Sequence, residues 1–398
     1  MKNLISILIV AFFLVFINFK SHSQSAGCTP PSSAYYLDIN NVRALIMNGS
    51  DMWWDLQGVA KYEIPKGSGK SSLFAGSIWI GGLDQNGQLR VAGQKFRQNG
   101  NDFWPGPLVT TGASQATTAV ETCLLYDKIF QITRYEVQAF RQWYNTPVAQ
   151  RDSLFPYYTI PNSIINWPAN GDIANNYSNY LAPFYDNNSD AFYNPNDGDY
   201  PYFDLDENIN CQDIPGSNKS ILYGDVALWW VFNDNGNIHT ETGGDAFGIE
   251  VHAQAFAYMS NDAAINNSTF YQYEIFNRST NAFHDSYIGF WTDADLGFAE
   301  DDFVGCDVSR GLGYVYNGTS VDGSGQSWAY GAYPPAVGID FIRGPYKDSD
   351  GTDDLTNWNN LHVLDCSNGY RYNPISENLE IVGSGDILII NRNPKNQV

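Results

Sequence analysis

Residues 249–257 alternate apolar and polar side chains with a period of two, which limits the fold more than any other feature of the chain. Successive side chains of a β-strand point to opposite faces, so this period predicts a strand with one face directed inward. The alternating residues are Ile249, Val251, Ala253, Ala255 and Ala257 against Glu250, His252, Gln254 and Phe256.

Other short stretches of strand-forming residues recur between clusters of Gly, Asn and Asp. Residues 77–81 and 88–92 predict a hairpin, because Asn86-Gly87 between them supplies the positive φ angles of a tight turn. Further strands are expected at 128–133, 269–276, 287–291 and 387–390. The spacing predicts an all-β fold, an antiparallel sandwich-like arrangement. For residues 134–144 a helix remains the alternative, since Tyr135, Ala139 and Phe140 would share a helix face.

The chain divides into four parts by composition. Residues 1–23 form a signal peptide, 24–145 an N-terminal β-rich region, and 221–398 a β-sandwich-like region. Between them, 146–220 is rich in Asn, Asp, Pro and Tyr and poor in aliphatic residues, which predicts a long loop-rich insertion. Because a strand is expected close to Val398, we expect the sequence to be the front portion of a longer protein.

The first residues have the three parts of an export signal. Lys2 precedes an apolar run at residues 4–19, and Ser21 and Ser23 supply small residues for cleavage before Gln24. No later stretch is long and apolar enough to span a membrane. The sequence therefore predicts a protein that is secreted or displayed at the cell surface.

The mature chain is strongly acidic. The formal charge of the whole sequence is −22, and loss of residues 1–23, with two lysines and no acid, makes it −24. Such a surface repels phosphate backbones, so no nucleic-acid partner is expected, and it attracts cations. The cysteines Cys28, Cys123, Cys211, Cys306 and Cys366 allow two disulfides and one free thiol, but their spacing does not fix a pairing.

A candidate calcium loop lies within the insertion. Oxygen-bearing side chains occupy positions 1, 3, 5, 9 and 12 of residues 186–197, and the residue at position 7 would offer its carbonyl oxygen. Ala191 stands at position 6, where Gly is usual, and the alternative is a turn that binds nothing. The expected ligands are Asp186, Asn188, Asp190, Phe192, Asn194 and Asp197.

A second candidate calcium site follows the strand that ends near Trp291. Crowded carboxylates there would raise one another's pKa unless a cation intervened. The expected ligands are Asp293, Asp295, Asp301 and Asp302.

Catalytic motifs are weak in comparison. A glycoside hydrolase needs two suitably separated carboxylates, and among 43 acidic residues such a pair arises easily by chance. Trp53-Trp54 and Trp229-Trp230 could stack on sugars, although burial is the more common fate of Trp. We therefore lean towards a non-enzymatic protein, with a paired-carboxylate glycosidase as the alternative.

Several phrases together resemble the N-terminal region of large secreted Bacteroidetes proteins that carry a C-terminal type IX secretion sorting domain. The likeness extends over roughly residues 35–345, and it implies export followed by passage through the type IX machinery. Residues 391–398 show no sorting pattern, which implies a truncated chain or a different route. The matching phrases are WIGGL (79–83), GNDFWPGP (100–107), GDYP (198–201), WWVFND (229–234), DDFVGCD (301–307) and GLGYVYNG (311–318).

These observations lead to one functional hypothesis with two alternatives. The chain is expected to be a secreted or cell-surface protein, stabilised by calcium, that serves in adhesion or in contact with glycans or other surface polymers. The alternatives are the glycoside hydrolase and a structural scaffold for downstream domains.

Overall fold

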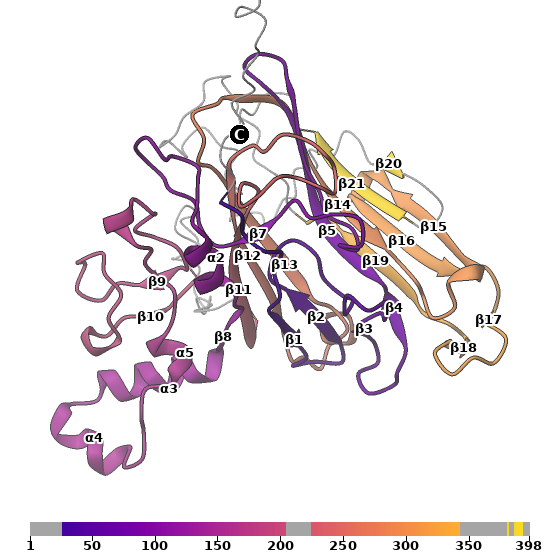
Figure 1. Ribbon diagram of the computed structural model, residues 1–398. Helices are drawn as coiled ribbons and strands as arrows, with labels where there is room; N and C mark the ends of the chain where they lie inside the picture. The colour runs from indigo at the N-terminus through magenta and orange to yellow at the C-terminus, as the bar shows by residue number, and fades with distance from the viewer. Residues whose placement is uncertain (1–25, 204–223, 343–379, 382–385, 393–398) are drawn as a thin grey trace, which may run out of the picture.

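The computed structural model describes residues 26–203, 224–342, 380–381 and 386–392, and its strands form packed antiparallel sheets (Figure 1). The all-β, sandwich-like fold expected from the sequence is therefore confirmed. The candidate signal peptide, Cys211 and Cys366 lie outside the described residues.

A central sheet has the strand order β13-β12-β11-β7, and β8 also pairs with β11. The alternating segment forms β12 and pairs along its length with both neighbours, so that Ala253 lies between Trp230 and Tyr273. The strands are β7 (Trp104–Pro105), β8 (Phe130–Thr133), β11 (Val226–Asn233), β12 (Ile249–Ala257) and β13 (Phe270–Asn277).

A second sheet has the order β20-β21-β14-β5-β6. Its β5 and β6 form the predicted hairpin, and Gly87 in the turn has a φ of 73°, which glycine adopts without strain. Since β5 pairs with β14, the regions 24–145 and 221–398 share one sheet. The strands are β5 (Ala75–Asp84), β6 (Leu89–Ala92), β14 (Phe283–Asp293), β20 (Glu380–Ile381) and β21 (Asp386–Arg392).

Smaller sheets complete the β structure. A four-stranded sheet contains β1 (Ala34–Leu37), β2 (Arg43–Met47), β3 (Tyr62–Glu63) and β4 (Ser71–Leu73). A three-stranded sheet contains β15 (Asp302–Asp307), β16 (Leu312–Asn317) and β19 (Ala336–Asp340). Two strand pairs are β9 (Phe184–Tyr185) with β10 (Tyr200–Pro201), and β17 (Val321–Asp322) with β18 (Gly331–Ala332).

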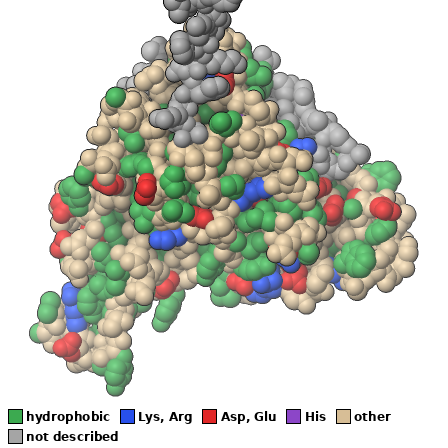
Figure 2. All heavy atoms as spheres, in the orientation of Figure 1, with side chains coloured by type: hydrophobic (Ala, Val, Ile, Leu, Met, Phe, Trp, Pro, Cys, Tyr) green, Lys and Arg blue, Asp and Glu red, His purple; other side chains and the backbone are tan. Residues whose placement is uncertain are grey.

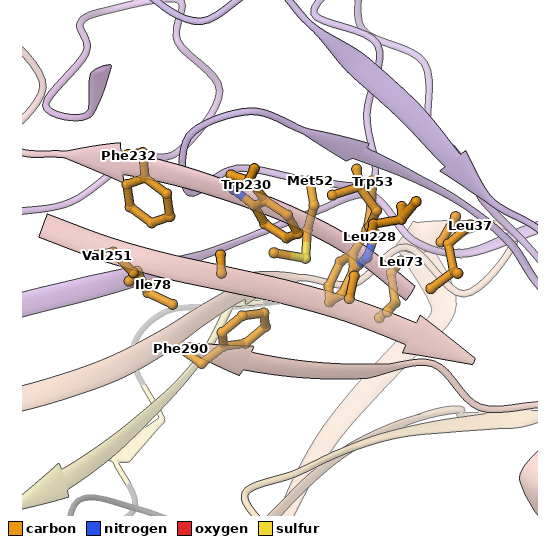
Figure 3. Packing of buried hydrophobic residues seen from close by; sticks show 14 of the residues in the cluster. Leu37, Met52, Trp53, Leu73, Ile78, Leu228, Trp230, Phe232, Val251 and Phe290 are labelled. Carbon is orange, nitrogen blue, oxygen red and sulfur yellow. The ribbon is translucent and has the colours of Figure 1, made fainter. Parts of the chain in front are cut away.

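The main hydrophobic core lies between the central and second sheets. Leu228, Trp230 and Phe232 project from one face of β11 into the same cluster as Ile78 of β5 and Phe290 of β14 (Figure 3). Burying one such side chain contributes about 1.5–3 kcal/mol. The core therefore joins strands that are distant in the sequence.

The helices α3, α4 and α5 lie together on one flank of the sheets, and α4 and α5 belong to the insertion (Figure 1). The helical alternative for 134–144 is correct: Thr133 caps this helix by accepting from the Glu136 amide at 3.1 Å, and the Glu136 carboxylate accepts from the Thr133 amide at 3.0 Å. The helices are α2 (Val120–Tyr126), α3 (Arg134–Asn145), α4 (Val148–Leu154), α5 (Asn162–Ile165) and α6 (Ala263–Asn266).

Helix α3 and the insertion that follows it pack on the second face of the central sheet and form another core there. Phe140 of α3, Ile164 of α5 and Trp167 are buried in one cluster with Trp229 and Val231 of β11. Both faces of β11 and β12 are consequently buried along their whole lengths. The period-two pattern correctly predicted the position of β12. It predicted one buried face, whereas both faces of β12 are buried.

One disulfide is present among the described cysteines, between Cys28 and Cys123, whose Cα atoms are 6.0 Å apart. It ties the first described residues to α2, where the two cysteines pack with Trp104. Cys306 in β15 carries a free thiol.

Candidate functional site

Four carboxylates gather where the second sheet meets the three-stranded sheet. Asp295 follows β14, Asp301 and Asp302 stand at the start of β15, and Asp322 ends β17. Their charges act on one another, because the Asp302 carboxyl is influenced by the other three. The structure thus brings together three of the acids predicted for the second calcium site and adds Asp322.

We call the site formed by Asp295, Asp301, Asp302 and Asp322 the acidic edge. Within it, Asp302 has a buried carboxylate oxygen that lacks a hydrogen bond. Its Oδ2 accepts a hydrogen bond from the Leu296 amide at 2.8 Å, while its Oδ1 is buried without a hydrogen-bond partner. Burial raises the pKa of Asp302 to about 7, and the negative charges of Asp322, Asp301 and Asp295 act in the same direction. A cation beside Oδ1 would remove this electrostatic penalty.

The neighbouring acids are held by backbone amides. Asp301 accepts from the Gly323 amide at 2.9 Å, and the fully buried Asp322 accepts from the Phe298 amide at 3.0 Å and from the Tyr330 amide. Gly297 lies directly against Asp322, since a β-carbon at position 297 would stand 2.1 Å from Asp322 Oδ2. Its φ of 76° also favours glycine, so close approach and backbone conformation both fix this residue.

Asp293, the remaining acid predicted for this site, ends β14, where its backbone carbonyl accepts from the Phe74 amide at 2.9 Å. Asp322 was missed because it follows the other acids by 20 residues in the chain. The sequence feature that could have pointed to Asp322 is the Asp322-Gly323 turn, but many other turns in this sequence look the same.

The candidate loop at 186–197 is organised by its own polar side chains. Asp186 Oδ1 accepts from the Ser189 amide at 2.7 Å, and its Oδ2 accepts from the Ala191 amide at 2.7 Å. Ala191 has a φ of 67°, so position 6 adopts the turn for which glycine is usual. The predicted sharp turn is present even though its residue is Ala.

The other predicted ligands of the loop pair with one another or face solvent. Asn188 Nδ2 donates to Asp190 Oδ2 at 2.9 Å, and Asn194 Nδ2 donates to Asp197 Oδ2 at 2.6 Å. The side chain of Phe192 is 53% exposed. Because it has no oxygen, Phe192 could bind a cation only through its backbone carbonyl.

Asp199, just beyond this loop, was not predicted as a site residue, yet it is fully buried at the loop's base. It accepts from the Asn187 amide at 2.9 Å and from the Asn194 amide at 2.8 Å. Burial raises the pKa of Asp199, and the charges of Asp186 and Asp190 raise it further. The loop therefore concentrates negative charge around a buried acid.

Neither acidic region is a finished metal site. Across the described ranges, no three His, Cys, Asp or Glu side chains are grouped so that they could hold a metal ion as they stand. Calcium coordinates six to eight oxygens, including carbonyls and water, so a site here would need backbone oxygens or a small rearrangement of the carboxylates.

A buried charge cluster, which was not predicted from the sequence, lies on the second face of β12. Glu250 Oε1 accepts from His252 Nε2 at 2.8 Å and from Arg278 at 2.7 Å, and Oε2 accepts from the Leu108 amide at 2.7 Å. Burial alone would raise the pKa of Glu250, but His252 and Arg278 hold it below its usual value.

A second buried cluster surrounds His239. Its Nδ1 lies 2.9 Å from the Val91 carbonyl oxygen and its Nε2 lies 2.6 Å from the Asp234 carbonyl oxygen. The carboxylates of Asp102 and Asp234 lie close by, each with an oxygen 3.8 Å from a ring nitrogen.

The tryptophans considered for sugar stacking are core residues. Trp53, Trp54, Trp229 and Trp230 expose 2%, 1%, 2% and 0% of their surface. A sugar in solution cannot reach their rings, so the expectation that these pairs could stack on a glycan is wrong. Both pairs are buried because strands or loops cover each of the faces they occupy.

Comparisons with known proteins leave this architecture without a match. No family model matches the chain, no curated protein matches it, and no solved structure matches it. None of the helices within the described residues is both long enough and apolar enough to cross a membrane.

Proposed function

We propose that this chain is an exported protein of the cell surface or medium that contacts surface polymers and is stabilised by calcium at its acidic edge. The observation that carries the calcium proposal is Asp302, a carboxyl with a buried oxygen without a hydrogen-bond partner, close to Asp295, Asp301 and Asp322. A cation there would offset the mutual repulsion of these acids. Calcium at the 186–197 loop would act in the same way on Asp186, Asp190 and Asp199.

Export is supported by four further features. The Cys28–Cys123 disulfide is typical of an oxidising compartment. The start of the sequence has the pattern of a signal peptide, and the resemblance to Bacteroidetes proteins supports the type IX route. The net charge of −22 fits a protein that meets millimolar calcium outside the cell.

The calcium proposal is tested by thermal unfolding of the mature chain in excess chelator and in calcium. We expect calcium to stabilise the wild type by about 2.7 kcal/mol at a hundredfold excess over Kd, because calcium binds the folded state. The Asp302→Asn variant should lose most of this gain. As a matched control, Asp152→Asn removes an exposed acid on α4 and should respond to calcium like the wild type.

In chelator, Asp302→Asn should increase the stability of the fold, and the increase should depend on pH. The pKa of Asp302 is about 7 in the folded chain, above its ordinary value of 3.8, so its ionisation destabilises the fold as pH rises through 7. Asp302→Asn should therefore be more stable than the wild type at pH 8, and this advantage should disappear on acidification towards pH 4. An equal calcium response in all three proteins would refute the role of Asp302.

A further inference from the structure

The outer face of the three-stranded sheet carries an exposed aromatic strip. Val304, Val315 and Val337 project inward from β15, β16 and β19 and pack on the main core. The alternate residues face outward, and among them Phe303 is 56% exposed and Tyr316 is 43% exposed. Hydrophobic side chains are visible on this flank of the molecule, where Figure 1 places β15 to β19 (Figure 2).

The rings on this face form a continuous row across two strands. Phe303 lies directly opposite Tyr316 in the sheet, and their ring centroids are 6.1 Å apart with an angle of 28° between the ring planes. Tyr314, two residues before Tyr316 and thus on the same face, has its centroid 6.0 Å from that of Tyr316, with an angle of 35°. The three rings are therefore neighbours with similar orientations.

Glycines allow these rings to lie close to the sheet. A β-carbon at Gly305 would stand 2.5 Å from the Tyr314 ring, and one at Gly318 would stand 2.2 Å from the Phe303 ring. Each ring thus occupies space that a side chain on the neighbouring segment would fill. On β19, the outward residues beside the rings are the small, exposed Ala336 and Gly338. The three rings therefore form a flat aromatic surface close to the sheet, and no large side chain of β19 projects beside them.

The chemistry of this surface fits a sugar polymer. The C–H faces of pyranose rings stack on aromatic rings, and a flat strip covers only one face of each sugar, so binding requires several linked units. Asp340 is exposed at the end of β19, and the chain as a whole is strongly acidic, which disfavours anionic polymers. Carboxylates can also accept hydrogen bonds from hydroxyl groups.

We infer that Phe303, Tyr314 and Tyr316 form a stacking platform for a neutral linear polysaccharide. The inference rests on the proposed contact with surface polymers and assigns that contact to the outer face of β15 and β16. It replaces the buried tryptophan pairs with rings that a polymer can reach.

The test is affinity gel electrophoresis of the mature chain in gels that contain hydroxyethylcellulose, xyloglucan or galactomannan, with alginate as the anionic comparison. We expect retardation of the wild type in at least one neutral gel and none in alginate. The variant Phe303→Ala/Tyr316→Ala should raise the apparent Kd about tenfold or more. Phe303→Tyr/Tyr316→Phe, which keeps both rings, should bind like the wild type.

A matched control removes two rings on the opposite flank, in Tyr135→Ala/Tyr157→Ala, whose side chains are 79% and 95% exposed. This control should bind like the wild type, and circular dichroism should show both alanine variants folded. If the wild type is retarded and Phe303→Ala/Tyr316→Ala binds equally well, polymer contact stands and the platform is wrong. If the wild type binds none of the polymers, both proposals fail.

A second copy of the chain is the competing occupant of this face. Light scattering after size-exclusion chromatography distinguishes it, because stacking on a polysaccharide predicts the same mass for the wild type and for Phe303→Ala/Tyr316→Ala. A wild-type dimer that becomes a monomer in this variant would overturn the inference.

Discussion

Removal of the Cys28–Cys123 disulfide is expected to lower the free energy of unfolding by roughly 4–5 kcal/mol, the largest effect we predict. The bond closes a loop with a sequence separation of 95 residues, and a long loop loses much entropy in the unfolded chain when it is closed. Both cysteines are buried, at 2% and 3% exposure, so their replacement also removes packing against Trp104.

The measurement is urea unfolding of Cys28→Ser/Cys123→Ser beside the wild type, without reductant. Changing both cysteines avoids leaving one of the pair as an additional free thiol. Cys306→Ser is the control, because Cys306 is a free cysteine in β15 and its replacement closes or opens no loop. A loss below about 1 kcal/mol in the double variant would contradict the stabilising role of this bond.

Glu250→Gln is expected to cost about 3–5 kcal/mol, the second largest effect. The substitution keeps the shape of the side chain but removes the negative charge that His252 and Arg278 share. Glu250 is fully buried, so the Arg278 guanidinium would lose the carboxylate that compensates its charge. Breaking one member of a buried ion cluster is more costly than replacing the whole cluster with apolar residues.

This prediction also has a pH dependence of definite sign. Burial raises the pKa of Glu250, but His252 and Arg278 outweigh it and leave the pKa below the ordinary 4.5. The contribution of Glu250 to stability is therefore complete above pH 4.5 and is lost as pH falls through the folded-state pKa. Gln does not titrate, so the difference in stability between wild type and variant should narrow on acidification.

Urea unfolding at pH 7 and at several acidic pH values measures both effects. The matched control is Glu274→Gln, since Glu274 lies opposite His252 in β13 but is exposed. We expect the control to change stability by less than about 0.5 kcal/mol. Equal effects of Glu250→Gln and Glu274→Gln would show that burial of the cluster contributes little.

The sequence predicted the strands well because strand formation has local signals. The alternation at 249–257 matches β12, and the Asn86-Gly87 turn matches the hairpin of β5 and β6. The helix at 134–144 was left open by the sequence, and the face expected for it is wrong: Val137 and Phe140 are buried, whereas Tyr135 is 79% exposed. The capping box at Thr133 decides it in the structure.

The candidate sites were predictable only in part. Asp295, Asp301 and Asp302 are near one another in the chain, and they do come together. Asp322 joins them because strand pairing returns the chain to the same edge after β16, which no local pattern specifies. The partner of Cys28 is likewise set by the path of the chain, since Cys123 is 95 residues away.

By itself, the sequence determined the all-β class, the positions of several strands such as β12 and the β5–β6 hairpin, and the acidic character of the chain, but not the central strand β11. These follow from side-chain period, turn residues and composition, which act over a few residues. Only the tertiary structure decided which of these side chains remain in contact with solvent. Trp229 is buried because α3 and the insertion pack on its face, whereas Phe303 and Tyr316 are exposed because none of the described elements covers theirs. Exposure depends on what packs on a strand, and that is determined by residues far away in the chain.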